Sequence, residues 1–325
     1  MIATMGEALV DMIEQTDGRF QACLGGSVCN FTLGLARQGV TTAYLNPLST
    51  DRFGARFTNL LSASEVNLAA PQQSSRPTSI AVVSLDAQGS PTYAFHREAI
   101  ADRDVSAAEL IAGFPEQLDL LHTGGLALVP EDLEKTLAVM RAATMRGALV
   151  SIDANVRPMV VKEVAEYVQG VKRAIAQAHI VKVSVEDLDA LGIDSANLQS
   201  LANALFLQSA VQLIVLTRGA DGAALVTRHC QLEMAAPAGL QVTDTVGAGD
   251  CFHAGLIACL QRSGGLASAA ALEQLDRNAL QSALQHALAA ASINIRRAGC
   301  DPASWEETIE FKNCHAVAND VLPQD

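Results

Sequence analysis

A glycine-rich loop in the last third of the chain combines the residues of an anion site with an acid. The segment Asp244–Asp250 reads Asp-Thr-Val-Gly-Ala-Gly-Asp, and it runs into an apolar segment typical of a helix. Gly247, Ala248 and Gly249 have almost no side chain, so a ligand can approach their backbone closely. Free N–H groups at a helix start attract phosphate. An acid there would repel an anion, so we expect Asp250 to take a proton from an attacking hydroxyl group.

The composition of the chain excludes several classes of partner. The chain has 325 residues, of which 50% are hydrophobic, and its formal net charge is −13. Because Lys and Arg form no cluster, neither nucleic acid nor an anionic membrane is expected as a partner. No apolar run approaches the roughly 20 residues that span a bilayer, and no signal peptide is recognisable. The seven cysteines have no metal-binding spacing, so we expect reduced thiols in a cytoplasmic protein.

Strand-like and helix-like segments alternate along most of the chain. Residues 2–11 are typical of a short buried strand that ends at Asp11, and a helix is expected to end at Gly39. Further strands are expected at 118–122, 148–153, 180–183 and 212–217, with helices between them. This alternation predicts an α/β fold in which helices cover a mainly parallel sheet. After Asp250 the chain is expected to be helical almost to Arg297, with one clear break at Gly264–Gly265.

Two segments interrupt the alternation. Residues 79–85 and 91–96 are typical of strands, and 86–89 would form the turn of a hairpin that stands apart from the main sheet. A second hairpin is expected at 222–226 and 230–234. No linker separates two domains, so residues 1–325 are expected to form a single domain with a loose tail at 315–325.

The expected sheet brings the polar motifs together. Ligands of parallel sheets bind beyond the carboxyl ends of the strands. Six segments are expected at that edge: Asp11, Gly25–Gly26, Asp153–Arg157, Ser184–Asp187, Thr217–Gly219 and Asp244–Asp250.

The glycine loop, together with a Gly-Gly-x-x-x-Asn motif at Gly25–Asn30, resembles the two signatures of the ribokinase-like (PfkB) family of sugar and nucleoside kinases. The motifs occur in the family's order, more than 200 residues apart, and the resemblance covers residues 2–310. It implies a three-layer α/β/α fold with a mainly parallel central sheet. A small β-lid, from about 12–22 and 74–97, would close over the sugar.

The resemblance also implies roles for individual residues. Asp250 matches the catalytic base, and Gly247, Ala248 and Gly249 match the anion hole for the γ-phosphate of ATP. The positions that match sugar or substrate contacts are Asp11, Gly25, Gly26, Asn30, Arg97, Asn155 and Arg157. The positions assigned to the nucleotide are Lys182, Ser184, Thr217, Gly219 and Gly222.

Metal binding is implied by the same resemblance. The family often has Asn-x-x-Glu where this chain has Ser184-Val185-Glu186-Asp187, and that motif organises Mg²⁺ and its waters. Asp187, with Glu186 beside it, can still hold a hydrated Mg²⁺, because this ion prefers carboxylates and its own waters. Many members also bind a monovalent cation such as K⁺. Asp244 and the carbonyl oxygen of Val246 would be its local ligands.

The identity of the acceptor stays open at this point. The segment Tyr93–Arg103 resembles the corresponding stretch of fructokinases, with His96 in place of an aromatic residue. A 2-keto-3-deoxygluconate kinase and a nucleoside kinase are alternatives, and a non-catalytic sugar or nucleotide sensor is the rival from another class. A sugar acid requires a cation facing its carboxylate, which Arg97, Arg103 or Arg157 would have to supply. The resemblance further suggests a homodimer that pairs through the lid.

Overall fold

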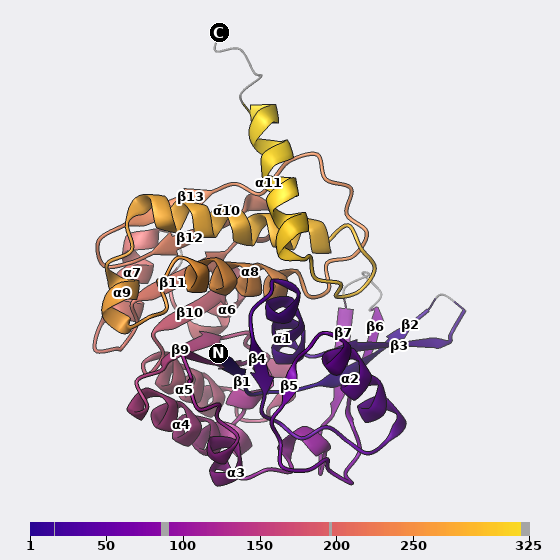
Figure 1. The fold of residues 1–325 in the computed structure, drawn as a ribbon. Helices are drawn as coiled ribbons and strands as arrows, with labels where there is room; N and C mark the ends of the chain where they lie inside the picture. Colours follow the sequence, from indigo (N-terminus) through magenta and orange to yellow (C-terminus); the bar gives the residue numbers. More distant parts are fainter. Residues whose placement is uncertain (16, 86–90, 195–196, 320–325) are drawn as a thin grey trace.

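Two β-sheets and the helices around the larger one make up the fold. The computed structural model describes residues 1–15, 17–85, 91–194 and 197–319 (Figure 1). The predicted turn at 86–89 and the end of the predicted tail therefore lie outside the described residues. No described helix is long and apolar enough to cross a membrane.

The larger sheet has nine strands in the order β13-β12-β11-β10-β9-β8-β1-β4-β5. Neighbours from β11 to β5 pair in parallel, whereas β12 and β13 add an antiparallel edge. Its strands are β1 (Ile2–Thr4), β4 (Thr42–Tyr44), β5 (Asn67–Leu68), β8 (Leu120–Gly124), β9 (Leu149–Asp153), β10 (Ile180–Ser184), β11 (Leu213–Thr217), β12 (Ala223–Val226) and β13 (Gln231–Met234). The central strands are buried along their length, as expected for a sheet covered on both faces.

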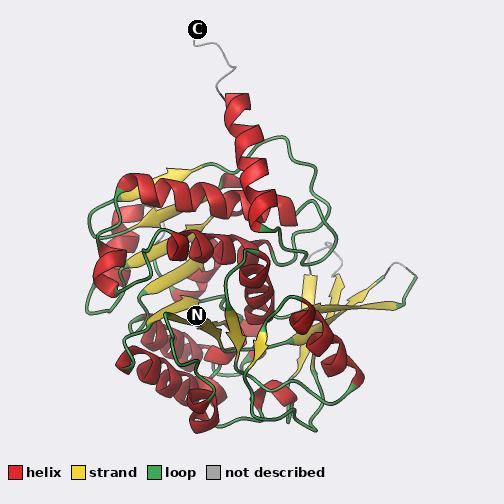
Figure 2. Cartoon of the chain, in the orientation of Figure 1, coloured by secondary structure: helices red, strands yellow, loops and turns green. Residues whose placement is uncertain are grey.

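Helices cover both faces of this sheet and complete three layers (Figures 1 and 2). One face carries α1 (Ser27–Arg37), α8 (Ala248–Arg262), α9 (Ala269–Glu273), α10 (Arg277–Asn294) and α11 (Trp305–Asn319). The other carries α3 (Ala107–Ala112), α4 (Pro130–Met145), α5 (Val164–Ile175), α6 (Val185–Leu191) and α7 (Leu198–Phe206). Each face buries its own apolar cluster against the sheet. The predicted α/β architecture is confirmed.

The smaller sheet projects from the side of the larger one (Figure 2). Its order is β3-β2-β6-β7, with strands β2 (Leu9–Glu14), β3 (Phe20–Gly25), β6 (Ser79–Leu85) and β7 (Pro91–His96). The predicted hairpin of 79–85 and 91–96 therefore belongs to a separate sheet, and β2 and β3 extend it. Helix α2 (Arg52–Ala63) packs near its base, where Val10 and Phe57 share an apolar cluster.

Short polar residues determine where several helices begin. The side chains of Asp51, Ser106, Ser184 and Asp276 each accept a hydrogen bond from a backbone N–H in the first turn of α2, α3, α6 and α10. Such N-caps satisfy donors that the helix itself leaves unpaired.

The structure differs from the sequence expectations at three points. Residues 2–11 do not form one strand, because Gly6, at φ 159°, separates β1 from β2 and the two strands enter different sheets. The helical region after Asp250 has a second break at 274–276, where Asp276 caps a new helix. Helix α11 continues to Asn319, into the segment expected to be loose.

Candidate active site

A cleft of about 560 Å³ opens between the two sheets. Leu9, Asp11 and Phe95 line it from the smaller sheet, and Asp153 and Thr217 line it from strand ends of the larger sheet. This volume is in the range of small-molecule sites. The expected gathering of motifs at the carboxyl edge is therefore present in the structure.

Asp250 lies where the two sequence signatures meet. The hydroxyl group of Ser27 donates to its Oδ1 at 2.8 Å, and the side-chain amide of Asn30 donates to its Oδ2 at 2.9 Å. Burial raises the pKa of Asp250, and the hydrogen bonds from Asn30 and Ser27 offset part of that effect. Both partners donate to the carboxylate, so they fix its orientation in the cleft and favour its charged form.

The glycine loop lies directly beside this carboxylate. Helix α8 begins at Ala248 with Gly247 as its N-cap, which places Asp250 in the first turn. Gly247 has φ 72°, and a side chain there would collide with Cys300. The N–H of Ala248 already donates to the carbonyl oxygen of Thr245, so the N–H groups of Gly249 and Asp250 are the donors that this turn can present to the cleft.

A buried ion pair supplies a positive charge beneath the loop. The ammonium group of Lys182 lies 2.7 Å from Oδ2 of Asp153, and both side chains are buried. A Cβ atom on Gly249 would lie only 3.3 Å from the Lys182 nitrogen. Burial lowers the pKa of Lys182, but neighbouring carboxylates, chiefly Asp153, more than reverse this, so the net pKa is raised. The lysine therefore stays protonated next to the candidate anion site.

Asp11 faces the cleft from β2. Its pKa is raised to about 6, first by burial and then by the charge of Asp250. Gly25 lies on the neighbouring strand β3, opposite Leu9, and a Cβ atom on it would come within 2.5 Å of Oδ2 of Asp11. The glycine at position 25 therefore makes room for this carboxylate, and Gly26 and Asn30 line the cleft next to it.

The segment after β9 contributes Asn155 and Arg157 to the cleft wall. Asn155 has φ 37°, an uncommon conformation for a residue other than glycine and one that is enriched at functional sites. Thr217 lines the cleft as well. Gly219 and Gly222 form the adjacent turn but do not line the cleft, so their assignment to the nucleotide stays a prediction.

The residues assigned to metals already make protein contacts. Asp187 accepts hydrogen bonds from the N–H groups of Val156 and Ser184, at 2.6 and 2.8 Å. Glu186 is exposed at the cleft, and local hydrogen bonds lower its pKa, so it is the freer carboxylate of the two. Among the described residues no three His, Cys, Asp or Glu side chains form a metal cluster. A metal held mainly by water and phosphate oxygens agrees with this arrangement.

The proposed K⁺ ligands are occupied in a similar way. Asp244 accepts hydrogen bonds from the N–H groups of Val246 and Gly299, and the carbonyl oxygen of Val246 accepts one from the side chain of Asn294. Asn294 and Gly299 therefore lie next to these two residues, but cation binding there stays a prediction.

Arg97 does not reach the cleft. Its guanidinium group pairs with Asp102 at 2.9 Å and donates to the carbonyl oxygen of Leu126 at 3.2 Å. The two side chains are only 11% and 5% exposed. They line a small cavity behind the cleft, so a direct contact between Arg97 and a ligand in the cleft is absent from this geometry.

Sequence reasoning missed Glu7 and Ser27 as site residues. Glu7 is 3% exposed and lines the cleft, and its Oε1 accepts a hydrogen bond from the N–H of Ser27. Burial raises the pKa of Glu7 to about 7, although Arg97 lowers it in part. The position of Ser27 within the Gly-Gly motif was the available signal, whereas an acid directly after Gly6 carried none.

A polar chain in the core anchors the first turns of α8. The side chain of His253 contacts the Ser151 hydroxyl at 2.7 Å, and Ser151 contacts His122 at 3.2 Å. Burial lowers the pKa of both histidines, so they remain neutral. Because Ser151 lies two residues before Asp153, this chain fixes the helix of Asp250 relative to the buried ion pair.

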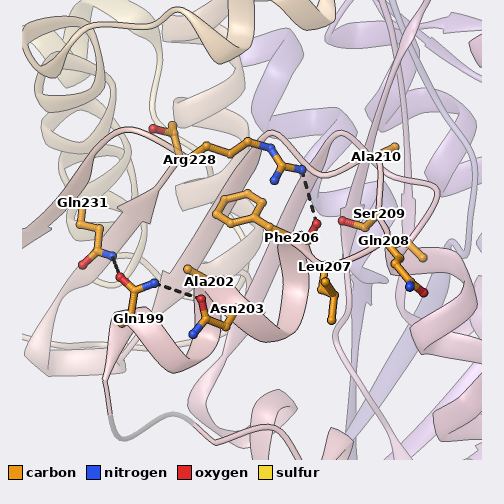
Figure 3. Close-up of a pocket in the computed structure, with 12 residues that line it drawn as sticks. Gln199, Ala202, Asn203, Phe206, Leu207, Gln208, Ser209, Ala210, Arg228 and Gln231 are labelled. Atoms are coloured by element: carbon orange, nitrogen blue, oxygen red, sulfur yellow. Dashed lines mark hydrogen bonds between the residues drawn. The ribbon is translucent and has the colours of Figure 1, made fainter.

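A larger pocket, of about 1040 Å³, lies at the opposite edge of the sheet (Figure 3). It lies near the amino end of β11, between α7 and the β12–β13 turn. Arg228, the only charged residue among the described ones that line the pocket, stacks over the Phe206 ring at 4.9 Å (Figure 3). The described lining holds no acid and base that could act together, so the smaller cleft is the better candidate for an active site.

Comparison with known proteins agrees with the geometry. Residues 1–307 match the family described as pfkB family carbohydrate kinase. The chain is 33% identical to a fructokinase of Rhizobium leguminosarum bv. trifolii, over 87% of this chain and 86% of the relative. The structure of Xylella fastidiosa fructokinase with bound ATP is similar with a TM-score of 0.85, 26% identity and coverage of 97% and 98%. Vibrio cholerae O395 fructokinase, in fructose, ADP and calcium ion bound form, is similar with a TM-score of 0.78, 25% identity and coverage of 95% and 98%.

The fold and the site together define a phosphotransferase that acts on an alcohol group. A carboxylate, a helix start and a buried lysine meet in the cleft, and such groups suit the alignment and charge stabilisation of phosphoryl transfer. The chain belongs to the pfkB family of carbohydrate kinases, and its fold is the ribokinase-like fold predicted from the two signatures.

Proposed function

We propose that this protein transfers the γ-phosphate of ATP to a hydroxyl group of fructose. The observation that carries the proposal is the position of Asp250, which Ser27 and Asn30 hold between an acid-lined space and the glycine loop. We call the side of Glu7, Asp11 and Asn30 the acceptor end, and the side of Gly247–Gly249 and Lys182 the phosphate end. The similar proteins named fructokinase support fructose as the acceptor.

The two ends divide the work of the reaction. Asp250 takes the proton of the attacking hydroxyl group, the sugar oxygen forms a bond to the γ-phosphorus, and the bond to the ADP oxygen breaks. The N–H groups of the loop and the ammonium group of Lys182 stabilise the negative charge that gathers on the transferred group. Such transfer depends on alignment and charge stabilisation more than on covalent catalysis.

The residues at the phosphate end fit a hydrated Mg²⁺. Glu186 and Asp187 would hold it, and Oδ1 of Asp153 is buried with no hydrogen-bond partner among the described residues. When bound, Mg²⁺ neutralises charge on the phosphate oxygens. We propose Mg²⁺ as the divalent ion, and a chelator should then abolish activity.

The charges of the site favour a neutral acceptor over a sugar acid. Arg97 is neutralised by Asp102, and Arg103 by Asp132 at 2.8 Å. Arg157 lines the cleft and acts electrostatically on both Glu186 and Asp250, so it is the one of the three arginines that faces the site. Glu7 and Asp11 at the acceptor end suit hydroxyl groups and repel a carboxylate.

We also propose that the smaller sheet acts as the lid. It supplies one wall of the cleft, and its closure would exclude water, which competes with the sugar for phosphate. Pairing of two copies through this sheet remains a prediction that light scattering tests. A cytoplasmic location agrees with seven free cysteines.

The direct test is coupled ADP release with fructose, ribose, 2-keto-3-deoxygluconate and several nucleosides. Fructose should give the highest kcat/KM, at least about tenfold above the acid, because an unfavourable charge interaction of 1.4 kcal/mol is a factor of ten. Preference for the acid or a nucleoside would overturn fructose as the acceptor. Binding of sugar without ADP release from any acceptor would indicate a sensor.

A further inference from the structure

Glu7 has one carboxylate oxygen that the protein does not use. Its Oε1 accepts the N–H of Ser27 at 3.1 Å, which fixes the start of α1. Its Oε2 is buried and has no hydrogen-bond partner among the described residues. A buried acceptor without a partner costs free energy, so it persists where a ligand or a water satisfies it.

The surroundings of Glu7 leave room for that ligand on the cleft side. Gly125 has φ 52°, and a Cβ atom there would lie 3.2 Å from Oε1 of Glu7, 3.6 Å from Nδ2 of Asn155 and 3.8 Å from the free Oε2 of Glu7. The missing side chain leaves a niche between a carboxylate and an amide. All three residues line the cleft that also holds Asp11 and Asp250.

The other side of Glu7 is closed by charged groups. Arg97 and Asp102 lie behind it in the small cavity, and each affects its titration, as does Asp250 from the cleft. Arg97 pairs with Asp102 and donates to the carbonyl oxygen of Leu126, and its Nε, like Oδ1 of Asp102, is buried with no partner among the described residues. Glu7 lines both the small cavity and the cleft, so a water in the small cavity and a hydroxyl group in the cleft are the two partners open to its free oxygen.

We propose that Glu7 is an acceptor-binding residue, whose free oxygen accepts a hydrogen bond from one hydroxyl group of the sugar. Its second oxygen holds the helix that carries Ser27 and Asn30, so the same side chain links the bound sugar to the residues that position Asp250. The inference rests on the proposed function, because it takes the cleft to be a sugar site.

The test is a cycle that combines Glu7→Gln with deoxy analogues of the accepted sugar. In the wild-type enzyme, removal of the recognised hydroxyl should lower kcat/KM by about 10- to 100-fold, the range for a hydrogen bond to a charged group. In Glu7→Gln, removal of the same hydroxyl group should lower kcat/KM by less than about threefold. For the other deoxy analogues, kcat/KM should fall by the same factor in both enzymes. Glu134→Gln, an exposed acid on α4, is the matched control and should behave as the wild type.

Two outcomes of this cycle would overturn the proposed role of Glu7. Equal losses in both enzymes for every analogue would overturn the inference and leave Glu7 as a helix cap only. A cycle in which all hydroxyl groups couple equally would also overturn it, since it indicates general displacement of the sugar. If Glu7→Gln does not fold, Glu7→Asp keeps the charge but withdraws it, and the same single-hydroxyl coupling should be lost. A wild-type enzyme without ADP release would instead contradict the proposed function, separately from this cycle.

Discussion

The acceptor end and the phosphate end of the cleft differ in their charged groups, although Asp250 borders both. At the acceptor end, Glu7 and Asp11 are carboxylates whose pKa values are raised to about 7 and about 6. At the phosphate end, Lys182 remains charged beneath a helix start. The difference teaches how a chain of net charge −13 can handle a nucleotide. Lys182 and the N–H groups at the start of α8 lie at one end of the cleft, and Glu7 and Asp11 lie at the other.

The largest effect is expected from a change at Asp250, which lies between the two ends of the cleft. Asp250→Asn keeps the size of the side chain but cannot take a proton, so kcat should fall by at least about 10³-fold. Binding of ATP, measured by calorimetry, should change less than about threefold. Turnover at the wild-type rate would refute the base assignment.

At the phosphate end, loss of Lys182 should lower kcat with little effect on the sugar. Because Lys182→Met alone leaves Asp153 buried without its partner, we pair it with Asp153→Asn to limit destabilisation. The double variant should fold, with kcat lowered about 10²-fold and the KM for fructose within about twofold. Lys162→Met, at an exposed lysine, is the control. A raised KM for fructose with unchanged kcat would place Lys182 at the wrong end.

At the acceptor end, Asp11→Asn should have the opposite kinetic pattern. The KM for fructose should rise about tenfold or more, since a hydrogen bond to a charged group is lost, whereas the KM for ATP should stay within about twofold. Steady-state kinetics with each substrate varied in turn measures both. An effect on ATP alone would contradict the division of the cleft.

The smallest expected effect is on stability, and it sharpens the account of Glu7. The pKa of Glu7 rises from 4.5 to about 7 on folding. In the pH window between these two values, the folded state therefore binds more protons than the unfolded state. Stability from this group is present below the window and is lost as pH rises through it. The groups that face Glu7 are Arg97, Asp102 and Asp250.

Melting temperatures of Glu7→Gln and the wild type should therefore diverge with pH. The melting temperature of the variant minus that of the wild type should increase by at least about 2 °C between about pH 5 and pH 8. Comparison at matched pH cancels the contribution of the buried histidines to stability. Their lowered pKa values destabilise both proteins equally in acid. A difference that is constant with pH would show that Glu7 does not titrate in this window.

The meeting of the two motifs at one edge of the sheet was predictable, whereas the partners of individual buried charges were not. The glycine loop and Gly25–Asn30 carried enough information to place Asp250 near Asn30, because parallel strands bring their following loops to one edge. Arg97 was expected in the site, but burial with Asp102 holds it behind the cleft wall. No pattern in the neighbouring sequence shows which buried acid forms an ion pair with which arginine or lysine.

The role proposed for Glu7 was likewise not predictable from the sequence. Its role depends on an oxygen left without a partner, and that is a property of packing rather than of residue type. The separation of β1 and β2 into two sheets likewise depends on the pairing partners of each strand, which lie far away in sequence.

The central claim is that phosphate passes from ATP to fructose within this cleft. The most direct measurement follows the label of γ-³²P-ATP in a single turnover with excess enzyme and fructose. We predict that the label appears in a fructose phosphate in the wild type, and that Asp250→Asn leaves it on ATP. Label in inorganic phosphate instead, or equally fast labelling of fructose by Asp250→Asn, would contradict the account.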